Sequence, residues 1–225
     1  MISICFAAPF DEDKGILSDG YSCEKIYSAF GEKERKRIDG ISNIQSKLLS
    51  LGGLFCLKTL TDRYLDGKTE LTLLRGSSGR PEFARKGIGD FNISHSASLA
   101  VAAFCSHGRI GIDIERVDRN RNIVGISERF FCSVERAYIE SASDKYLAFY
   151  KLWTAKEAFL KANGVGISSL SKVDVLSDSD RYYYCFVVKF FDENYVMTVC
   201  SETNENIDVI NNNGGIIING IPYGI

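Results

Sequence analysis

The chain has 225 residues, of which 45% are hydrophobic, enough to bury a core in one large domain or two small ones. Its formal net charge of −2 argues against a nucleic-acid partner, because nucleic-acid binding favours a strongly basic protein surface. No run of about 18 apolar residues occurs, so we expect no membrane span. The seven cysteines form no CxxC pair and mostly have apolar neighbours, so we expect reduced, buried thiols in a cytoplasmic protein.

The first half of the sequence predicts a strand, several helices and then a pair of strands. In order, these are a strand at 2–8, helices at 23–30, 32–38 and 42–64, a short strand at 71–74, a loop at 75–90 and a buried strand pair at 91–105. Gly52 and Gly53 are expected to bend or weaken the third helix, since glycine is a poor helix former. The mostly basic run at 32–37 is typical of a solvated helix face.

The second half repeats this order of elements. The predicted elements are a turn at 106–109, a strand at 110–117, helices at 127–140 and 146–163, a hairpin of strands at 182–189 and 195–200, and a polar loop at 204–213. Asn163 and Gly164 are expected to end the second of these helices. We therefore expect an α+β fold of two similar halves, residues 1–106 and 107–225, although no sequence repeat relates them.

An apolar and acidic alternation marks the strand at Gly111–Glu115. Because side chains alternate between the two faces of a strand, Ile112 and Ile114 point to one face and Asp113 and Glu115 to the other. Two carboxylates that lie two residues apart on one face are suited to share one hard cation. The pattern predicts half of a metal site.

A third carboxylate, Glu157, lies on the predicted helix at 146–163. On a helical wheel it stands nearly opposite the apolar face, with Lys161 one turn later. Taken alone, the pair is typical of a surface ion pair worth about 0.2–0.5 kcal/mol. Combined with Asp113 and Glu115, Glu157 instead completes an octahedral Mg²⁺ site in which water and phosphate oxygens fill the remaining positions.

A second polar segment begins the strand pair at 91–105. There Ser94 and His95 follow a loop that contains Arg80 and Pro81, and these types of side chain suit phosphate or nucleotide binding. A hydrogen-bonded structural role is the alternative for His95. His95 and His107 have no partner at metal-ligand spacing, so zinc is not expected.

Taken together, these motifs resemble the 4′-phosphopantetheinyl transferases, in particular the larger, surfactin-synthetase-activating class. The matching segments, in the family's order and spacing, are residues 79–81, 91–96, 111–115 and 153–166. The resemblance implies two pseudo-symmetric α+β halves with the active site, and coenzyme A, in the cleft between them. Because one chain holds both halves, it also implies a monomer.

The resemblance implies a reaction and its catalytic residues. The 4′-phosphopantetheine arm passes from coenzyme A to a serine of an apo acyl or peptidyl carrier protein of fatty-acid, polyketide or non-ribosomal peptide synthesis, and adenosine 3′,5′-bisphosphate is released. Asp113, Glu115 and Glu157 match the magnesium ligands, and Glu157 is also the implied base. Lys161 matches the lysine that neutralises the pyrophosphate. Glu135 matches a further acidic position that acts through a water.

The resemblance also implies the contacts to coenzyme A. The matching residues are Lys33, Lys36, Arg80, Pro81, Ser94 and His95. Ser94 and His95 match phosphate binders, and His95, Lys33 and Lys36 are implied near the 3′-phosphate. Arg80 and Pro81 stand where the family usually has Lys-Pro beside the adenine. One alternative is a magnesium-dependent nucleotide or coenzyme A pyrophosphatase, which would use the same groups with water as nucleophile. The other is a non-catalytic coenzyme A binding module, in which the carboxylate triad would be expected to be broken, whereas here it is intact.

Overall fold

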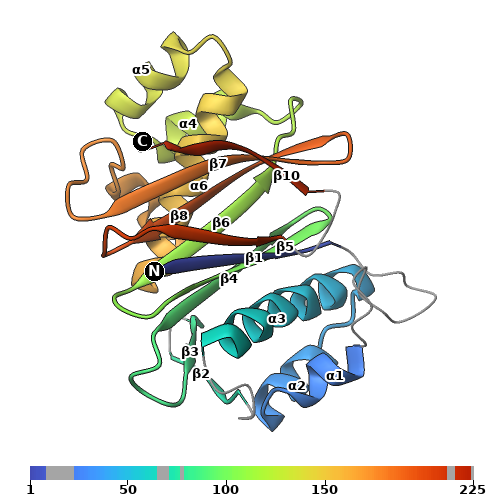
Figure 1. Ribbon diagram of the computed structural model, residues 1–225. Coiled ribbons are helices and arrows are strands. Elements are labelled where there is room, and N and C mark those ends of the chain that lie inside the picture. Colours follow the sequence, from blue (N-terminus) through green and yellow to red (C-terminus); the bar gives the residue numbers. More distant parts are fainter. Residues whose placement is uncertain (9–22, 65–70, 77–78, 212–215, 224–225) are drawn as a thin grey trace. The chain divides into compact units, whose positions relative to one another are not determined.

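The computed structural model describes residues 1–8, 23–64, 71–76, 79–211 and 216–223 (Figure 1). The chain forms two compact units. Unit 1 comprises residues 1–109 and 205–214, and unit 2 comprises residues 110–204 and 215–225. The boundary thus falls between residues 109 and 110, whereas the sequence predicts it after residue 106. Unit 1 also includes residues 205–214, which the sequence-based division assigns to the second half. In both units a run of helices is followed by a run of strands, which confirms the predicted α+β class.

Unit 1 is a four-stranded sheet with a long helix packed on it (Figure 1). Its elements are β1 (Ile2–Ala7), α1 (Cys23–Ser28), α2 (Glu32–Asp39), α3 (Ile44–Tyr64), β2 (Leu73–Arg75), β3 (Pro81–Phe83), β4 (Asp90–Ser96), β5 (Leu99–Cys105) and β9 (Ile207–Asn211). The sheet order is β4-β5-β1-β9, in which β1 is antiparallel to β5 and parallel to β9. A separate two-stranded sheet joins β2 and β3.

Two predicted loops of unit 1 are wrong. The stretch 75–90 contains β3, which pairs with β2 through Leu73 and Phe83. The stretch 204–213 contains β9, whose Ile207 lies opposite Ile2 of β1. Its short apolar run completes the sheet, although the polar residues around it favour a loop when the sequence is considered alone.

Helix α3 continues through Gly52 and Gly53, so the two glycines do not interrupt it. A Cβ atom on Gly53 would lie 2.5 Å from Cγ2 of Ile93, and one on Gly52 would lie 3.2 Å from Cβ of Ala100. The two glycines therefore let α3 approach β4 and β5 closely. The packing they permit compensates for their poor helix propensity.

Unit 2 has a four-stranded antiparallel sheet, of order β10-β7-β8-β6, and its own long helix. Its elements are β6 (Ile110–Arg116), α4 (Ile123–Phe130), α5 (Ser133–Ser141), α6 (Lys145–Asn163), the 3₁₀ helix η1 (Ile167–Lys172), β7 (Tyr182–Phe190), β8 (Glu193–Ser201) and β10 (Ile216–Tyr223). The single helix predicted at 127–140 is wrong, since Phe131 and Cys132 separate α4 from α5. Phe131 has an extended backbone and is buried, and Glu135 accepts from the amide of Cys132 at the start of α5.

Helix α6 ends where the sequence predicts. Asp144 caps its start by accepting from the amide of Leu147 at 3.0 Å, and Gly164 ends it in the left-handed conformation at φ 65°. The helix packs on β6 and β8. At the closest point a Cβ on Gly111 would lie 1.9 Å from the carbonyl oxygen of Ala158. Glycine at 111 thus sets how near α6 comes to the strand with the predicted metal ligands.

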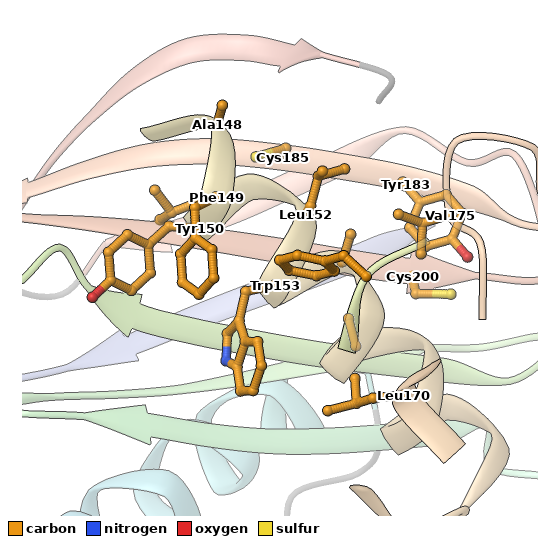
Figure 2. Close-up of a cluster of buried hydrophobic side chains, with 14 of the residues drawn as sticks. Ala148, Phe149, Tyr150, Leu152, Trp153, Leu170, Val175, Tyr183, Cys185 and Cys200 are labelled. Atoms are coloured by element: carbon orange, nitrogen blue, oxygen red, sulfur yellow. The ribbon is translucent and has the colours of Figure 1, made fainter. Parts of the chain in front are cut away.

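The core of unit 2 surrounds α6, and Figure 2 shows part of it, with the rings of Phe149, Tyr150 and Trp153 on neighbouring turns. In the described part of the chain, no helix is long and apolar enough to cross a membrane. The predicted thiols are confirmed for the cysteines that the structure describes with side chains. Five of these are buried and Cys132 is half-buried: Cys5, Cys56, Cys105, Cys132, Cys185 and Cys200.

Candidate active site

Strand β6 carries its charged and apolar side chains on opposite faces, as its alternation predicts. Ile112 and Ile114 are 0% and 1% exposed. Asp113 shares its face with Gly111, the face that α6 approaches, and is itself only 4% exposed. Glu115 lies further along the same face and is half-buried. The strand therefore brings a buried carboxylate against helix α6.

An ion pair joins the strand to the helix. The ammonium Nζ of Lys161 lies 2.6 Å from Oδ1 of Asp113, with the lysine side chain 29% exposed and the aspartate 6% exposed. Glu157 lies one turn before Lys161 on α6. Three of the residues predicted to be catalytic, Asp113, Glu157 and Lys161, thus come together inside unit 2.

The electrostatics of Glu157 reflect this gathering of charges. Burial raises the pKa of Glu157, and the negative charge of Asp113 raises it further. Lys161 and Arg121 act in the opposite direction, and Glu115 adds to the rise. A half-buried carboxylate with a raised pKa, beside other carboxylates and a lysine, has the character of a general base.

The donor set of this site fits a divalent metal ion. Asp113, Glu115 and Glu157 offer hard carboxylate oxygens, which Mg²⁺ prefers, and the charges of the first two reach Glu157. The carboxylate oxygens of these three residues do not all lie within 4.8 Å of one another. Among the described residues, a different group of side chains meets that spacing. Magnesium binding by the three carboxylates stays a prediction.

That other group comprises Cys132, Glu135 and Asp174, and an ammonium already lies within it. Nζ of Lys156 lies 3.0 and 2.7 Å from the two carboxylate oxygens of Glu135, and both side chains are fully buried. The amides of Cys132 and Val175 also donate to Glu135. Glu135 is therefore a structural partner of Lys156, and its action through a water stays a prediction.

Unit 1 holds the residues predicted to contact coenzyme A other than Lys161. On β4, Ser94 is buried and His95 is exposed. Lys33 and Lys36 are exposed on α2, where Lys36 pairs with Glu32 at 2.6 Å. Their exposure leaves His95 and both lysines accessible to an anion, and phosphate binding by these residues stays a prediction.

Arg80 has a structural partner that sequence patterns did not reveal. Its guanidinium donates to both carboxylate oxygens of Asp90, at 3.0 and 2.6 Å, and to the carbonyl of Phe91 at 3.2 Å. Arg80 is buried, and Pro81 begins β3 beside it. The bidentate pair fixes the start of β4 and already balances the charge of Arg80.

Two packing features of unit 2 are not predicted by the sequence analysis. Lys156 is fully buried although lysine is usually exposed, and Arg121 stacks on the ring of Trp153 at 5.0 Å. Both depend on partners that are distant in sequence.

Comparison with known proteins gives matches that agree with one another. Residues 109–209 match the family model described as the 4′-phosphopantetheinyl transferase superfamily. The 4′-phosphopantetheinyl transferase ffp of Bacillus subtilis is 30% identical over 67% of this chain and 72% of its own length. HetI of Nostoc sp., also a 4′-phosphopantetheinyl transferase, is 37% identical over 44% of each chain. A Synechocystis sp. relative is 32% identical over 68% of this chain and 64% of its own length.

Proposed function

Since the chain belongs to the 4′-phosphopantetheinyl transferase superfamily, we propose that it transfers the 4′-phosphopantetheine arm of coenzyme A to a serine of an apo acyl or peptidyl carrier protein. The other product is adenosine 3′,5′-bisphosphate. The matched region spans 64% and 44% of the Synechocystis and Nostoc relatives. The observation that most supports the proposal is the meeting of Glu157 with the Asp113–Lys161 ion pair in unit 2.

In the proposed reaction Glu157 is the base. The carrier's serine hydroxyl gives its proton to the Glu157 carboxylate while its oxygen forms a bond to the phosphorus that bears the pantetheine arm. The bond from that phosphorus to the bridging oxygen breaks, and the oxygen leaves with the bisphosphate. The raised pKa of Glu157 makes the carboxylate a better proton acceptor than an exposed glutamate.

The remaining charges of the site position and balance the pyrophosphate. Lys161 is held 2.6 Å from Asp113, which keeps its ammonium beside the carboxylates, where a phosphate oxygen is proposed to bind. Asp113, Glu115 and Glu157 would hold magnesium, which when bound neutralises phosphate charge as a Lewis acid. The burial of Asp113 limits its motion and so fixes the position of Lys161.

Residues of unit 1 are proposed to hold the nucleotide. The exposed side chains of Lys33, Lys36 and His95 offer donors to the 3′-phosphate, and Ser94 offers a hydroxyl to the phosphates. Pro81 is proposed to lie beside the adenine. Arg80 is proposed to support this contact indirectly, because its guanidinium is bound to Asp90.

The test is a transfer assay with Glu157→Gln, which keeps the size of the side chain and removes its basicity. Apo carriers of fatty-acid, polyketide and peptide synthesis are incubated with coenzyme A and Mg²⁺, and mass spectrometry detects a gain of one phosphopantetheine. We expect the variant to lose at least ~100-fold in rate and still bind coenzyme A. Glu140→Gln, at an exposed position of α5, is the matched control and should retain the wild-type rate.

Three results would contradict the proposal. Release of bisphosphate without any carrier would favour a pyrophosphatase. Coenzyme A binding with neither reaction would favour a binding module. Near-normal turnover of Glu157→Gln would remove Glu157 from the mechanism.

A further inference from the structure

The chain from the end of β6 to the start of α4 carries three arginines, and their partners differ. Nη1 of Arg116 lies 2.6 Å from Oε1 of Glu193, and Nη2 of Arg119 lies 2.5 Å from Oδ2 of Asp144. Arg121 makes no ion pair with a carboxylate in the part of the chain that the structure describes; its contacts are with aromatic rings. In that part of the chain no acidic side chain thus neutralises its charge by direct contact.

The position of Arg121 is nevertheless well defined. Its guanidinium carbon lies 5.0 Å from the ring centroid of Trp153 and 5.8 Å from those of Phe149 and Tyr150. All three rings are buried in the core around α6, as Figure 2 shows. The hydroxyl of Tyr150 accepts from the amide of Asp118 at 3.0 Å, which fixes the chain before Arg121. A guanidinium on aromatic faces keeps its N–H donors for an anion.

The aromatic rings place Arg121 next to the candidate active site. Trp153 and Glu157 are one turn apart on α6, so they lie on the same side of the helix. The charge of Arg121 reaches Glu157, where it acts against the rise in pKa, but the two side chains form no ion pair within 4.0 Å. Arg121 thus adds a cation near Glu157 besides Lys161, which is paired with Asp113.

We propose that Arg121 binds the phosphoryl group of coenzyme A that is transferred, as a further substrate-binding residue of the active site. This inference rests on the proposed function, in which Glu157 takes the proton of the serine that attacks this phosphorus. The part of coenzyme A that comes nearest to Glu157 during the reaction is then the phosphoryl group, and its oxygens match the planar donor fork of Arg121. A fixed guanidinium there balances charge that develops as the bond to the leaving oxygen breaks.

The experiment measures binding by calorimetry in the presence of Mg²⁺, with coenzyme A and with adenosine 3′,5′-bisphosphate, which lacks the transferred phosphoryl group. Arg121→Gln should weaken coenzyme A binding roughly 10- to 100-fold, as expected for the loss of charged hydrogen bonds, and leave bisphosphate binding unchanged. Arg121→Lys should weaken coenzyme A binding less than Arg121→Gln does, because lysine keeps the positive charge but lacks the planar donor fork of arginine. Arg119→Gln removes a cation two residues away and should change binding less than about twofold.

Far-ultraviolet circular dichroism checks that each variant folds, because the fluorescence of Trp153 responds to loss of the Arg121 contact itself. Equal effects of Arg121→Gln and Arg119→Gln, or equal weakening of both ligands by Arg121→Gln, would overturn the assignment. So would a raised KM for the carrier with coenzyme A binding unchanged, since Arg121 would then contact the carrier. If the wild type binds coenzyme A but transfers nothing, the proposed function fails while the calorimetry still tests Arg121.

Discussion

In unit 1 the long helix α3 packs on its sheet through glycines and apolar side chains, whereas in unit 2 the contact between α6 and its sheet also includes charged groups. Gly53 lies against Ile93 in the first contact, and the second contains the Asp113–Lys161 pair. Both sheets have four strands, and both helices run across them. The same layered arrangement thus supports two different kinds of helix–sheet contact.

The difference shows where the molecule gives up stability for chemistry. Burying apolar side chains under α3 is favourable, at about 25 cal/mol for each Å². Burying carboxylates under α6 is unfavourable unless they are paired, but a partly buried site also strengthens every charge interaction within it. We therefore assign the binding of reactive groups to the contact in unit 2 and expect the contact in unit 1 to act mainly as scaffold.

The largest effect is expected from a methyl group added at each helix–sheet contact. In Gly111→Ala the new Cβ meets the backbone of Ala158, which cannot move alone, so α6 must shift. We expect a loss of about 5 kcal/mol or more, or no folded protein, because large losses follow such backbone clashes. In Gly53→Ala the clash is with the end of the Ile93 side chain, and we expect a loss of about 1–3 kcal/mol.

Urea unfolding followed by far-ultraviolet circular dichroism and by Trp153 fluorescence measures both variants. A loss for Gly53→Ala as large as that for Gly111→Ala would show that the two helices are equally intolerant, and the proposed contrast between the units would be wrong.

A smaller loss is expected from breaking a buried ion pair in each unit. Lys156→Met leaves the fully buried carboxylate of Glu135 without its cation, which should cost about 3–5 kcal/mol. In unit 1, Arg80→Met removes the partner of Asp90, whose side chain is 15% exposed and can be hydrated, so we expect about 1–3 kcal/mol. Thermal and urea unfolding compare the two, and equal losses would argue against a special dependence of unit 2 on buried charge.

The features of the site that were predictable from sequence are local. The alternation in β6 is enough to separate Asp113 from Ile112, because the period of a strand is fixed by its backbone. The bounds of α6 follow from Asp144 and Gly164, which act on the nearest turn of the helix. The same patterns identify Glu157 and Lys161 as neighbours on one helix.

The features that were missed depend on distant parts of the chain. Glu135 and Lys156 are 21 residues apart, and each alone is typical of a surface position. Strand β9 pairs with β1, which lies at the other end of the sequence. The polar residues around β9 therefore do not indicate a strand when the sequence is considered locally. Arg121 is similar, since its aromatic partners come from α6. In each case tertiary packing overrides the local preference.

An effect of opposite sign in the two units is expected from removing one glutamate charge in each. In unit 1, Glu34 is buried and accepts from Arg37 at 2.7 Å and from Arg75 at 3.1 Å. Glu34→Gln should therefore destabilise the protein by about 1–3 kcal/mol at pH 7. In unit 2, Glu157→Gln should stabilise the protein in the presence of a chelator, because burial and then the charge of Asp113 oppose its ionisation.

The pH dependence separates these two effects. Because the pKa of Glu157 is raised in the folded protein, the stability that its protonated form contributes is fully present below the ordinary pKa of 4.5 and is lost as pH rises through the raised pKa. The advantage of Glu157→Gln over the wild type should thus be greatest at pH 7 and shrink as pH falls toward 4.5. Adding Mg²⁺ should stabilise the wild type more than Glu157→Gln, because a ligand that binds the folded state stabilises it. The contrary result is a Glu157→Gln variant that is less stable than the wild type at pH 7 with chelator. It would show that the carboxylate of Glu157 stabilises the fold as that of Glu34 does. The distinction between a scaffold contact in unit 1 and a reactive contact in unit 2 would then be wrong.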